Sequence, residues 1–261
     1  MTKTSRPKSS QAELGANAIL AVSIAACKAG AAEKEVSLYK HIADLSGKGK
    51  PVLPVPAITV ISGGKHAGNN LAAQEIMILP IGAHSFEEAM QIGSETYHHL
   101  KALILEKYGS SGCNVGDDEG LDLIKEAIER AGYTERIKLA MDFSATDFCI
   151  GKKYDLDIKS PNKSGQNFKT GEDLIKIYTQ LCTDYPLVSI EQPFDKDDWE
   201  HAKQFSDLGI CQVVGDDLLT SNSKRIERAI NESTCNALLL KVLATYLKPL
   251  FKSFCGLEKA K

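Results

Sequence analysis

The sequence predicts an α/β fold with a parallel sheet, and three observations support this prediction. Four segments, "IKLAMDF", "PLVSIEQ", "CQVVGDD" and "NALLLKV", are short and apolar without strict alternation. This pattern is typical of parallel strands that are covered on both faces. Stretches with helical periodicity separate these segments. Two further strand candidates, "AITVISGG" and "AAQEIMILPIG", precede them, so strands alternate with helices along most of the chain.

The N-terminal part of the chain is expected to be helical. Residues 1–13 begin with the basic stretch "MTKTSRPKSS", and we expect them to be disordered. The Ala-rich residues 14–34 predict a helix, and "SLYKHIADLSG" predicts a second, shorter one. The segment "GKGKPVLPVP" is rich in glycine and proline and marks a boundary. The apolar run 14–27 is shorter than the roughly 20 residues that a membrane span needs, so no membrane partner is expected.

Beyond this boundary, the helical stretches lie between the strand candidates. The segment "GKKYDLDIKS" reads as a hairpin-like insertion after the strand in "IKLAMDF". The expected helices span residues 85–107, 171–183, 197–207 and 223–231.

The composition is that of an ordinary soluble globular protein. The chain has 261 residues, a net charge of −3, 43% apolar residues and 25% charged residues. It contains no basic stripe and no recognition motif, so no nucleic-acid partner is expected. Its seven cysteines are scattered without a C-x-x-C pair. We therefore expect reduced thiols in a reducing compartment and a cytoplasmic location.

A charged residue follows each of the last four strand candidates. These residues are Asp142, Glu191, Asp216 and Lys241, at intervals of 49 (191−142), 25 (216−191) and 25 (241−216). About 25 residues suits one β/α unit, and 49 is close to two units or to one enlarged by the hairpin-like insertion. In a (β/α)₈ barrel, residues at the carboxyl ends of strands converge on the catalytic mouth. The spacing therefore predicts that three carboxylates and one lysine meet at a single site.

The chemistry of these four side chains points to a metal-assisted reaction. Three hard oxygen ligands suit Mg²⁺, which commonly keeps waters or substrate oxygens as its other ligands. A lysine beside such a cation has its ammonium form disfavoured, which suits a general base. A single acid at a strand end is more often a helix cap or a surface ion pair. The repeated interval favours the functional interpretation for the set as a whole.

Several longer segments resemble the enolase family, most closely its divergent plant cytosolic branch. They include "LPVPAITVISGGKHAGNNLAAQEIMILPIGA", "SIEQPFDKDDWE", "VVGDDLLTSN" and "CNALLLKV". The resemblance implies an enolase-type (β/α)₈ barrel that is incomplete, with about six of its eight strands. Residues 14–48 would be the C-terminal helices of the family's N-terminal domain, residues 49–242 a partial barrel and residues 243–261 a divergent tail. By this resemblance the chain is truncated at both ends.

The resemblance also implies a reaction, a cofactor and a site. Enolases dehydrate 2-phosphoglycerate to phosphoenolpyruvate with Mg²⁺, using a lysine as the base. By matching motifs, the resemblance assigns Asp142, Glu191 and Asp216 as metal ligands and Lys241 as the base. It assigns substrate contacts to His66, Glu75, Glu191, Asp216 and Lys241. Asp118 falls at the place of the family's acid, and Glu119 is the alternative.

The chain departs from the family pattern at three places. The text "NVGDDEGLDLIKEA" replaces a "VGDEGG"-like motif, and its loop is shortened so that the chain runs almost directly into a helix. Gln192 stands where the family commonly has aspartate, which removes a charge beside the metal ligands. After "LLLKV" the text no longer follows the family. There, residues 243–253 are amphipathic enough to form a helix that covers an opening of the barrel.

These departures leave three hypotheses open. The chain is a working enolase; or it is a catalytically inactive relative that binds metal or a partner; or it acts on a different carboxylate substrate, since fold alone does not fix the substrate. The expected partners are 2-phosphoglycerate and phosphoenolpyruvate, together with a second subunit in a homodimer or a full-length enolase.

Overall fold

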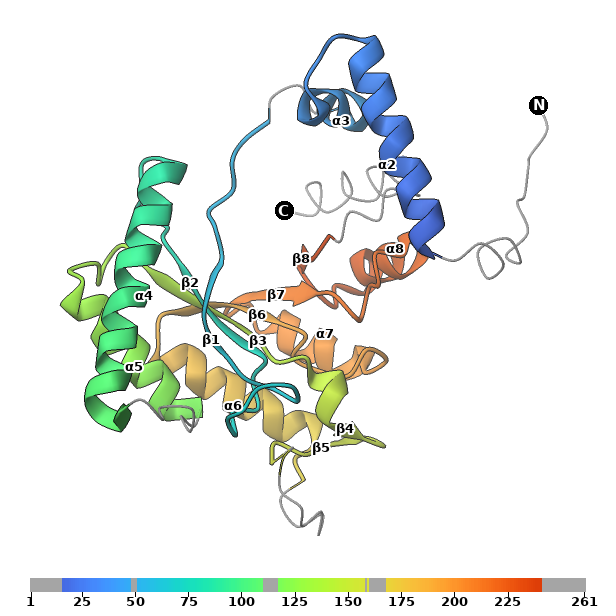
Figure 1. Ribbon diagram of the computed structural model, residues 1–261. Helices are drawn as coiled ribbons and strands as arrows, with labels where there is room; N and C mark the ends of the chain where they lie inside the picture. The colour runs from blue at the N-terminus through green and yellow to red at the C-terminus, as the bar shows by residue number, and fades with distance from the viewer. Residues whose placement is uncertain (1–15, 48–50, 110–116, 158, 160–167, 241–261) are drawn as a thin grey trace. The chain divides into compact units, whose positions relative to one another are not determined.

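The computed structural model (Figure 1) describes residues 16–47, 51–109, 117–157, 159 and 168–240. The expected disordered start, the tail 243–261 and the amphipathic stretch 243–253 lie outside these residues. The chain divides into two compact units. The smaller unit holds the first two described helices, and the larger one comprises Leu53–Thr220 and Lys224–Leu239.

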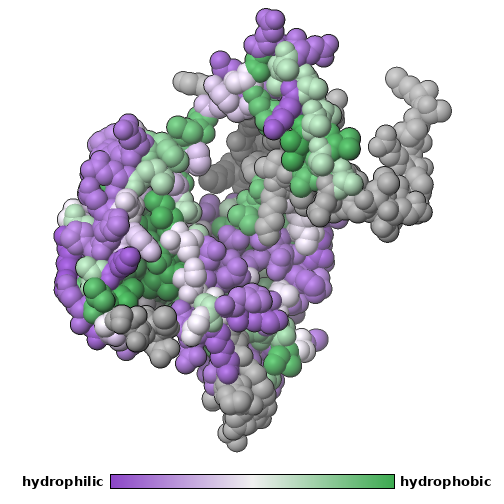
Figure 2. All heavy atoms as spheres, in the orientation of Figure 1, coloured by the Kyte–Doolittle hydropathy of each residue, from purple (hydrophilic) through white to green (hydrophobic). Residues whose placement is uncertain are grey.

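The smaller unit is a pair of helices, as the sequence predicts. Helix α2 spans Ala16–Glu33 and helix α3 spans Leu38–Ser46. The helices approach closely at Gly30, where an added Cβ would lie 3.0 Å from His41 Nε2. Apolar side chains of α2 remain exposed, with Val22 at 70%, and Figure 2 shows them as green atoms along this helix.

The larger unit is built on one six-stranded sheet whose strand order follows the sequence. Each of the six predicted strand segments supplies one strand. The four later strands pair in parallel, as predicted, whereas β2 is antiparallel to both of its neighbours. The strands are β1 (Ile58–Ser62), β2 (Glu75–Leu79), β3 (Lys138–Asp142), β6 (Leu187–Glu191), β7 (Gln212–Gly215) and β8 (Ala237–Leu238).

Helices connect the strands and cover the sheet (Figure 1). Two helices rather than one lie between β2 and β3, because the helix expected after the motif "NVGDDEG" begins at Asp117. A short 3-10 helix, η2 (Ala145–Phe148), and the predicted hairpin, β4 (Cys149–Ile150) with β5 (Lys153–Tyr154), follow β3. The α-helices are α4 (Phe86–Tyr108), α5 (Asp117–Arg130), α6 (Gly171–Asp184), α7 (Trp199–Asp207) and α8 (Ser223–Glu232).

Local capping fixes where these helices begin. The Ser85 hydroxyl accepts a hydrogen bond from the backbone N–H of Glu88 at 3.1 Å at the start of α4. At the start of α6, Thr170 and Asp173 form a reciprocal capping box. Both caps satisfy backbone donors that the first helical turn leaves unpaired.

A cluster of aromatic side chains packs between the helices and the strands that carry the acids. Phe143, which directly follows β3, lies 4.6 Å from Tyr178 of α6 between ring centroids. Tyr178 also contacts Phe194 and Phe205, and its hydroxyl donates to the Pro193 carbonyl at 2.8 Å. These side chains are buried, so they fix the segments that follow β3 and β6.

Within the described part of the chain, no helix has the length and apolar character needed to cross a membrane.

Candidate active site

Three of the predicted site residues lie at one edge of the sheet. Asp142, the last residue of β3, is directly opposite Glu75 of β2 and opposite Glu191 of β6. The backbone N–H of Phe143 donates to the Glu191 carbonyl at 3.1 Å and extends this pairing past the strand end. Since β2 is antiparallel, its first residue lies at the edge where its neighbour ends. This explains why an acid at the start of a strand belongs to the same site.

Asp216 joins this edge directly after β7. The backbone N–H of Gln192 donates to the Val214 carbonyl at 3.1 Å, which aligns the ends of β6 and β7. The preceding residue, Gly215, leaves no room for a side chain: an added Cβ would lie 2.7 Å from Leu219 Cδ1. Leu219 in turn belongs to a turn that closes on the Asp216 carbonyl at 2.9 Å. The local backbone thus holds Asp216 in a buried position.

The electrostatics of Asp142 indicate that several acids lie near one another. Burial raises the pKa of the Asp142 carboxyl to about 7, although a hydrogen bond from the Ser144 backbone N–H acts in the opposite direction. The negative charges of Glu75, Asp216 and Asp217 raise this pKa further. Acids from β2, β3 and the turn after β7 therefore act on one another electrostatically.

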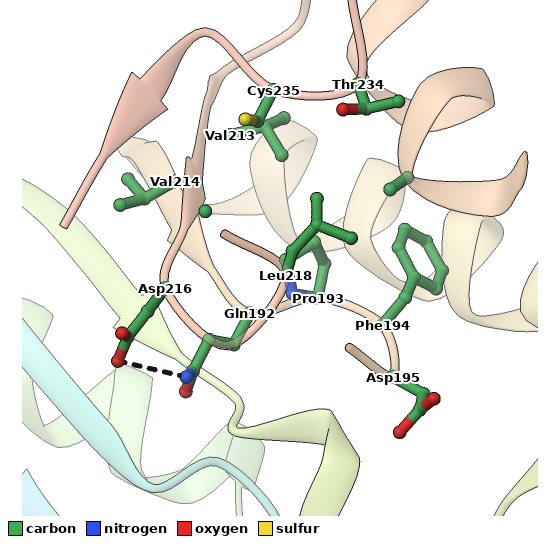
Figure 3. A pocket seen from close by; sticks show the side chains of 12 residues that line it. Gln192, Pro193, Phe194, Asp195, Val213, Val214, Asp216, Leu218, Thr234 and Cys235 are labelled. Carbon is green, nitrogen blue, oxygen red and sulfur yellow. Dashed lines mark hydrogen bonds between the residues drawn. The ribbon is translucent and has the colours of Figure 1, made fainter. Parts of the chain in front are cut away.

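Gln192 links the acids of β3 and β7 through side-chain hydrogen bonds. Its Nε2 donates to Asp216 Oδ2 at 3.2 Å, and Figure 3 shows the two side chains pointing toward each other. The Ser144 hydroxyl donates to Gln192 Oε1 at 2.8 Å, while the Ser144 backbone N–H donates to Asp142 Oδ1 at 2.9 Å. Ser144 and Gln192 both have positive φ, 48° and 50°, so the backbone bends sharply after each of the two strands.

Two hollows are found in the larger unit, and neither is lined by Glu75, Asp142 or Glu191. The hollow in Figure 3, beside Gln192 and Asp216, has a volume of about 20 Å³. That volume suits roughly one water molecule. A larger groove of about 700 Å³ lies by α7 and the β4–β5 hairpin. Polar residues that line this groove stabilise the local structure. Asp198 accepts a hydrogen bond from the His201 backbone N–H at the start of α7, and its carboxylate also accepts from the Tyr154 hydroxyl at 2.6 Å.

The donor set at the strand edge fits a hard divalent cation by its chemistry. Asp142, Glu191 and Asp216 supply carboxylate oxygens, which suit Mg²⁺. Burial together with neighbouring negative charge disfavours the ionised form of Asp142, and a cation would offset that cost. Among the residues that the structure describes, no three acidic, histidine or cysteine side chains already form a closed coordination group. A cation would therefore have to draw these side chains together.

The predicted substrate contacts Glu75 and His66 come from β2 and from the loop before it. Glu75 accepts a hydrogen bond from Thr59 Oγ1 at 2.7 Å. His66 is exposed in the loop between β1 and β2. That loop is held by Asn69, whose Nδ2 donates to the Ser62 carbonyl at 2.9 Å, and by Lys159. The Lys159 ammonium donates to two carbonyls of the loop.

The predicted base and the first candidate acid have side chains outside the described residues. Lys241 lies outside the described residues, three positions beyond the end of β8. The backbones of Asp118 and Glu119 lie in the first turn of α5, and Glu119 is exposed. The side chain of Asp118 is outside the described part of the chain.

Two residues of the site were not singled out from the sequence. Ser144 follows Asp142 by two positions, and an acid whose side chain bonds to the backbone N–H two residues later forms an Asx turn. The pattern D-x-S after a strand was the available signal. Asp217 was visible only as the second acid of "VGDD", and its effect on Asp142 depends on the tertiary fold.

Most of the chain is similar to known enolases. The family model for "Enolase, C-terminal TIM barrel domain" matches residues 50–245, and that for "Enolase, N-terminal domain" matches residues 4–42. "Cytosolic enolase 3" of Arabidopsis thaliana is 71% identical over 243 residues, covering 89% of this chain and 51% of the relative. "Enolase 2" of Hevea brasiliensis and "Enolase" of Solanum lycopersicum are each 55% identical, covering 88% of this chain and 55% of the relative. The chain thus spans about half the length of the curated relatives it matches.

Proposed function

The chain belongs to the enolase family, and on that premise we propose that it dehydrates 2-phosphoglycerate to phosphoenolpyruvate with the help of Mg²⁺. The observation that carries this proposal is the alignment of Glu75, Asp142 and Glu191 at one sheet edge, with Asp216 beside them. The name of the Arabidopsis relative, which calls it cytosolic, supports a cytoplasmic location for this chain.

Asp142, Glu191 and Asp216 are the residues that we assign to hold the cation. Bound there, Mg²⁺ would supply positive charge to stabilise the negative charge that develops on the substrate carboxylate. The chain itself keeps this edge rigid, because buried aromatic side chains fix the segments after β3 and β6. Since the pKa of Asp142 is raised to about 7, cation binding near neutral pH should release part of a proton from this carboxyl.

We assign the two proton transfers to a lysine and to an acid. Lys241, in its neutral form, removes the proton from the carbon next to the carboxylate. Asp118, or Glu119 in its place, delivers a proton to the departing hydroxyl group. His66 and Glu75 contact the substrate, and the anchored loop after β1 presents the former to solvent.

The test is phosphoenolpyruvate formation by the purified full chain, followed by ultraviolet absorbance with and without a chelator. We expect turnover that the chelator abolishes and that Asp142→Asn lowers at least tenfold. Asp147→Asn is the matched control, since Asp147 is an exposed acid on the same segment. Folded protein without turnover, or turnover that is indifferent to the chelator and to Asp142→Asn, would contradict the proposal. Turnover of other hydroxy acids only would favour a different reaction of the superfamily.

We also propose that the chain works as a dimer, with itself or with a full-length enolase. The exposed apolar side chains Val22 and Ile24 of α2 support an interface on the smaller unit. Gel filtration of the chain alone, and mixed with a full-length enolase, tests this. Elution as a monomer in both experiments would contradict it. A complex without turnover would support the catalytically inactive, partner-binding form.

A further inference from the structure

Gln192 occupies a constrained position between the assigned metal ligands. It directly follows Glu191, is only 8% exposed and has a φ of 50°. The resemblance noted above implies that the family commonly has aspartate at this position. Its side chain forms two hydrogen bonds: Nε2 donates to Asp216, and Oε1 accepts from the Ser144 hydroxyl.

An amide can make both of these contacts, because it carries a donor and an acceptor. An ionised carboxylate accepts hydrogen bonds and cannot donate, so the group that faces Asp216 has to be the NH₂ of Gln192. The same requirement fixes the orientation of the amide, whose oxygen then accepts from the Ser144 hydroxyl at 2.8 Å. Because Ser144 in turn binds Asp142 Oδ1 through its backbone N–H, a continuous chain of hydrogen bonds joins the two acids.

The charge balance of the edge favours the same arrangement. Four acids, Glu75, Asp142, Glu191 and Asp216, already lie at this edge. An aspartate at position 192 would bring one more negative charge beside Asp216, where the amide instead donates a hydrogen bond at 3.2 Å. Gln192 therefore orients Asp216 without adding to the repulsion.

We propose that Gln192 is a positioning residue that, together with Ser144, fixes the relative placement of Asp142 and Asp216 and so sets the affinity of this edge for a divalent cation. This inference rests on the proposed function, because it takes the two acids to be metal ligands. Residues that orient metal ligands typically change metal affinity by about 10–100-fold when they are replaced.

The test is calorimetric titration of the metal-free full chain with Mg²⁺ and Mn²⁺. We expect Gln192→Met to weaken the cation affinity about 10–100-fold, and Ser144→Ala to weaken it less. The double variant should bind about as weakly as Gln192→Met alone, because both residues act through one chain of hydrogen bonds. The matched control is Gln212→Met: Gln212 also accepts from a serine hydroxyl, Ser189 Oγ at 3.1 Å, but at the opposite end of β7.

Thermal unfolding of each variant without metal separates positioning from folding. A merely structural role would lower the unfolding temperature and leave the cation affinity of the folded chain unchanged, which would overturn the inference. If Gln192→Met does not fold, the cation affinity of Ser144→Ala is the deciding measurement. An unchanged affinity in that variant overturns the inference. A folded wild-type chain that binds neither cation overturns both the inference and the assigned metal site. Binding by the wild type that Gln192→Met leaves intact overturns the inference alone.

Discussion

Replacing Asp142 with asparagine is expected to stabilise the metal-free protein above neutral pH. The Asp142 carboxyl is 8% exposed, and burial raises its pKa from an ordinary value of 3.8 to about 7. Asparagine has nearly the same shape and can still accept the backbone N–H of Ser144, which now donates to Asp142 Oδ1 at 2.9 Å. The substitution therefore removes the buried charge and leaves the local turn in place.

The sign and size of the effect follow from this pKa. Because the pKa is higher in the folded state, that state binds the proton more tightly than the unfolded chain does. The contribution of Asp142 to stability is therefore present below about pH 4 and is lost as the pH rises to about 7. A pKa change of one corresponds to about 1.4 kcal/mol, so the full loss is about 4 kcal/mol. Asp142→Asn should exceed the wild type by up to that amount at pH 8.

Urea unfolding with a chelator at pH 5 and pH 8, followed by circular dichroism, measures this difference. The stability of Asp142→Asn relative to the wild type should increase by about 2–3 kcal/mol between the two pH values, since most of the window between pH 3.8 and 7 is then crossed. Asp147→Asn, at an exposed acid, should show no such increase. An equal difference at both pH values, or a variant that is less stable at pH 8, would contradict a raised pKa for the buried Asp142 carboxyl.

Three further predictions concern the scaffold around the site. Gly215→Ala should destabilise the protein by about 1–3 kcal/mol in urea unfolding, because its Cβ would lie 2.7 Å from Leu219 Cδ1. An unchanged free energy of unfolding would show that the Leu219 side chain can move aside without cost. Thr170→Ala should cost about 1 kcal/mol in the same assay by removing the cap of α6, and an unchanged midpoint would mean that the cap contributes nothing. Burial lowers the pKa of His201, but the hydrogen bonds and negative charges of Asp198 and Glu172 together outweigh burial, so the net pKa is raised. The stabilising effect of this pair is thus present below about pH 6.5 and lost as the pH rises, so His201→Gln should destabilise more at pH 5.5 than at pH 8.5.

Much of the fold could be predicted from apolar pattern and spacing. The segments around β3, β6 and β7 are short, apolar and bounded by helical stretches, so local sequence was enough to define them. The reversed direction of β2 could not be predicted in this way, because an apolar strand carries no mark of the direction in which it pairs. That direction depends on the loop of residues 63–74 folding back on β1, which is a tertiary event.

The candidate site was predicted in outline and not in its contacts. The repeated interval between Asp142, Glu191 and Asp216 predicted a common edge, and strand register supports that arrangement for the first two. The role of Gln192 could not be predicted, since the sequence suggested only a lost charge. The structure instead has its amide bonded to both sides of the edge, through partners 48 and 24 residues away. Such contacts depend on the fold as a whole.

The most direct test of the carboxylate edge is a titration of the metal-free chain with Mg²⁺ at pH 7, in two buffers of different ionisation enthalpy. We expect one cation to bind at this edge with release of about half a proton, because the pKa of Asp142 is about 7. Asp142→Asn should weaken the binding and abolish the proton release. Folded protein that binds no cation, or that binds one with no proton release and equally well without the Asp142 carboxyl, would contradict the claim that these strand-end acids form a metal site.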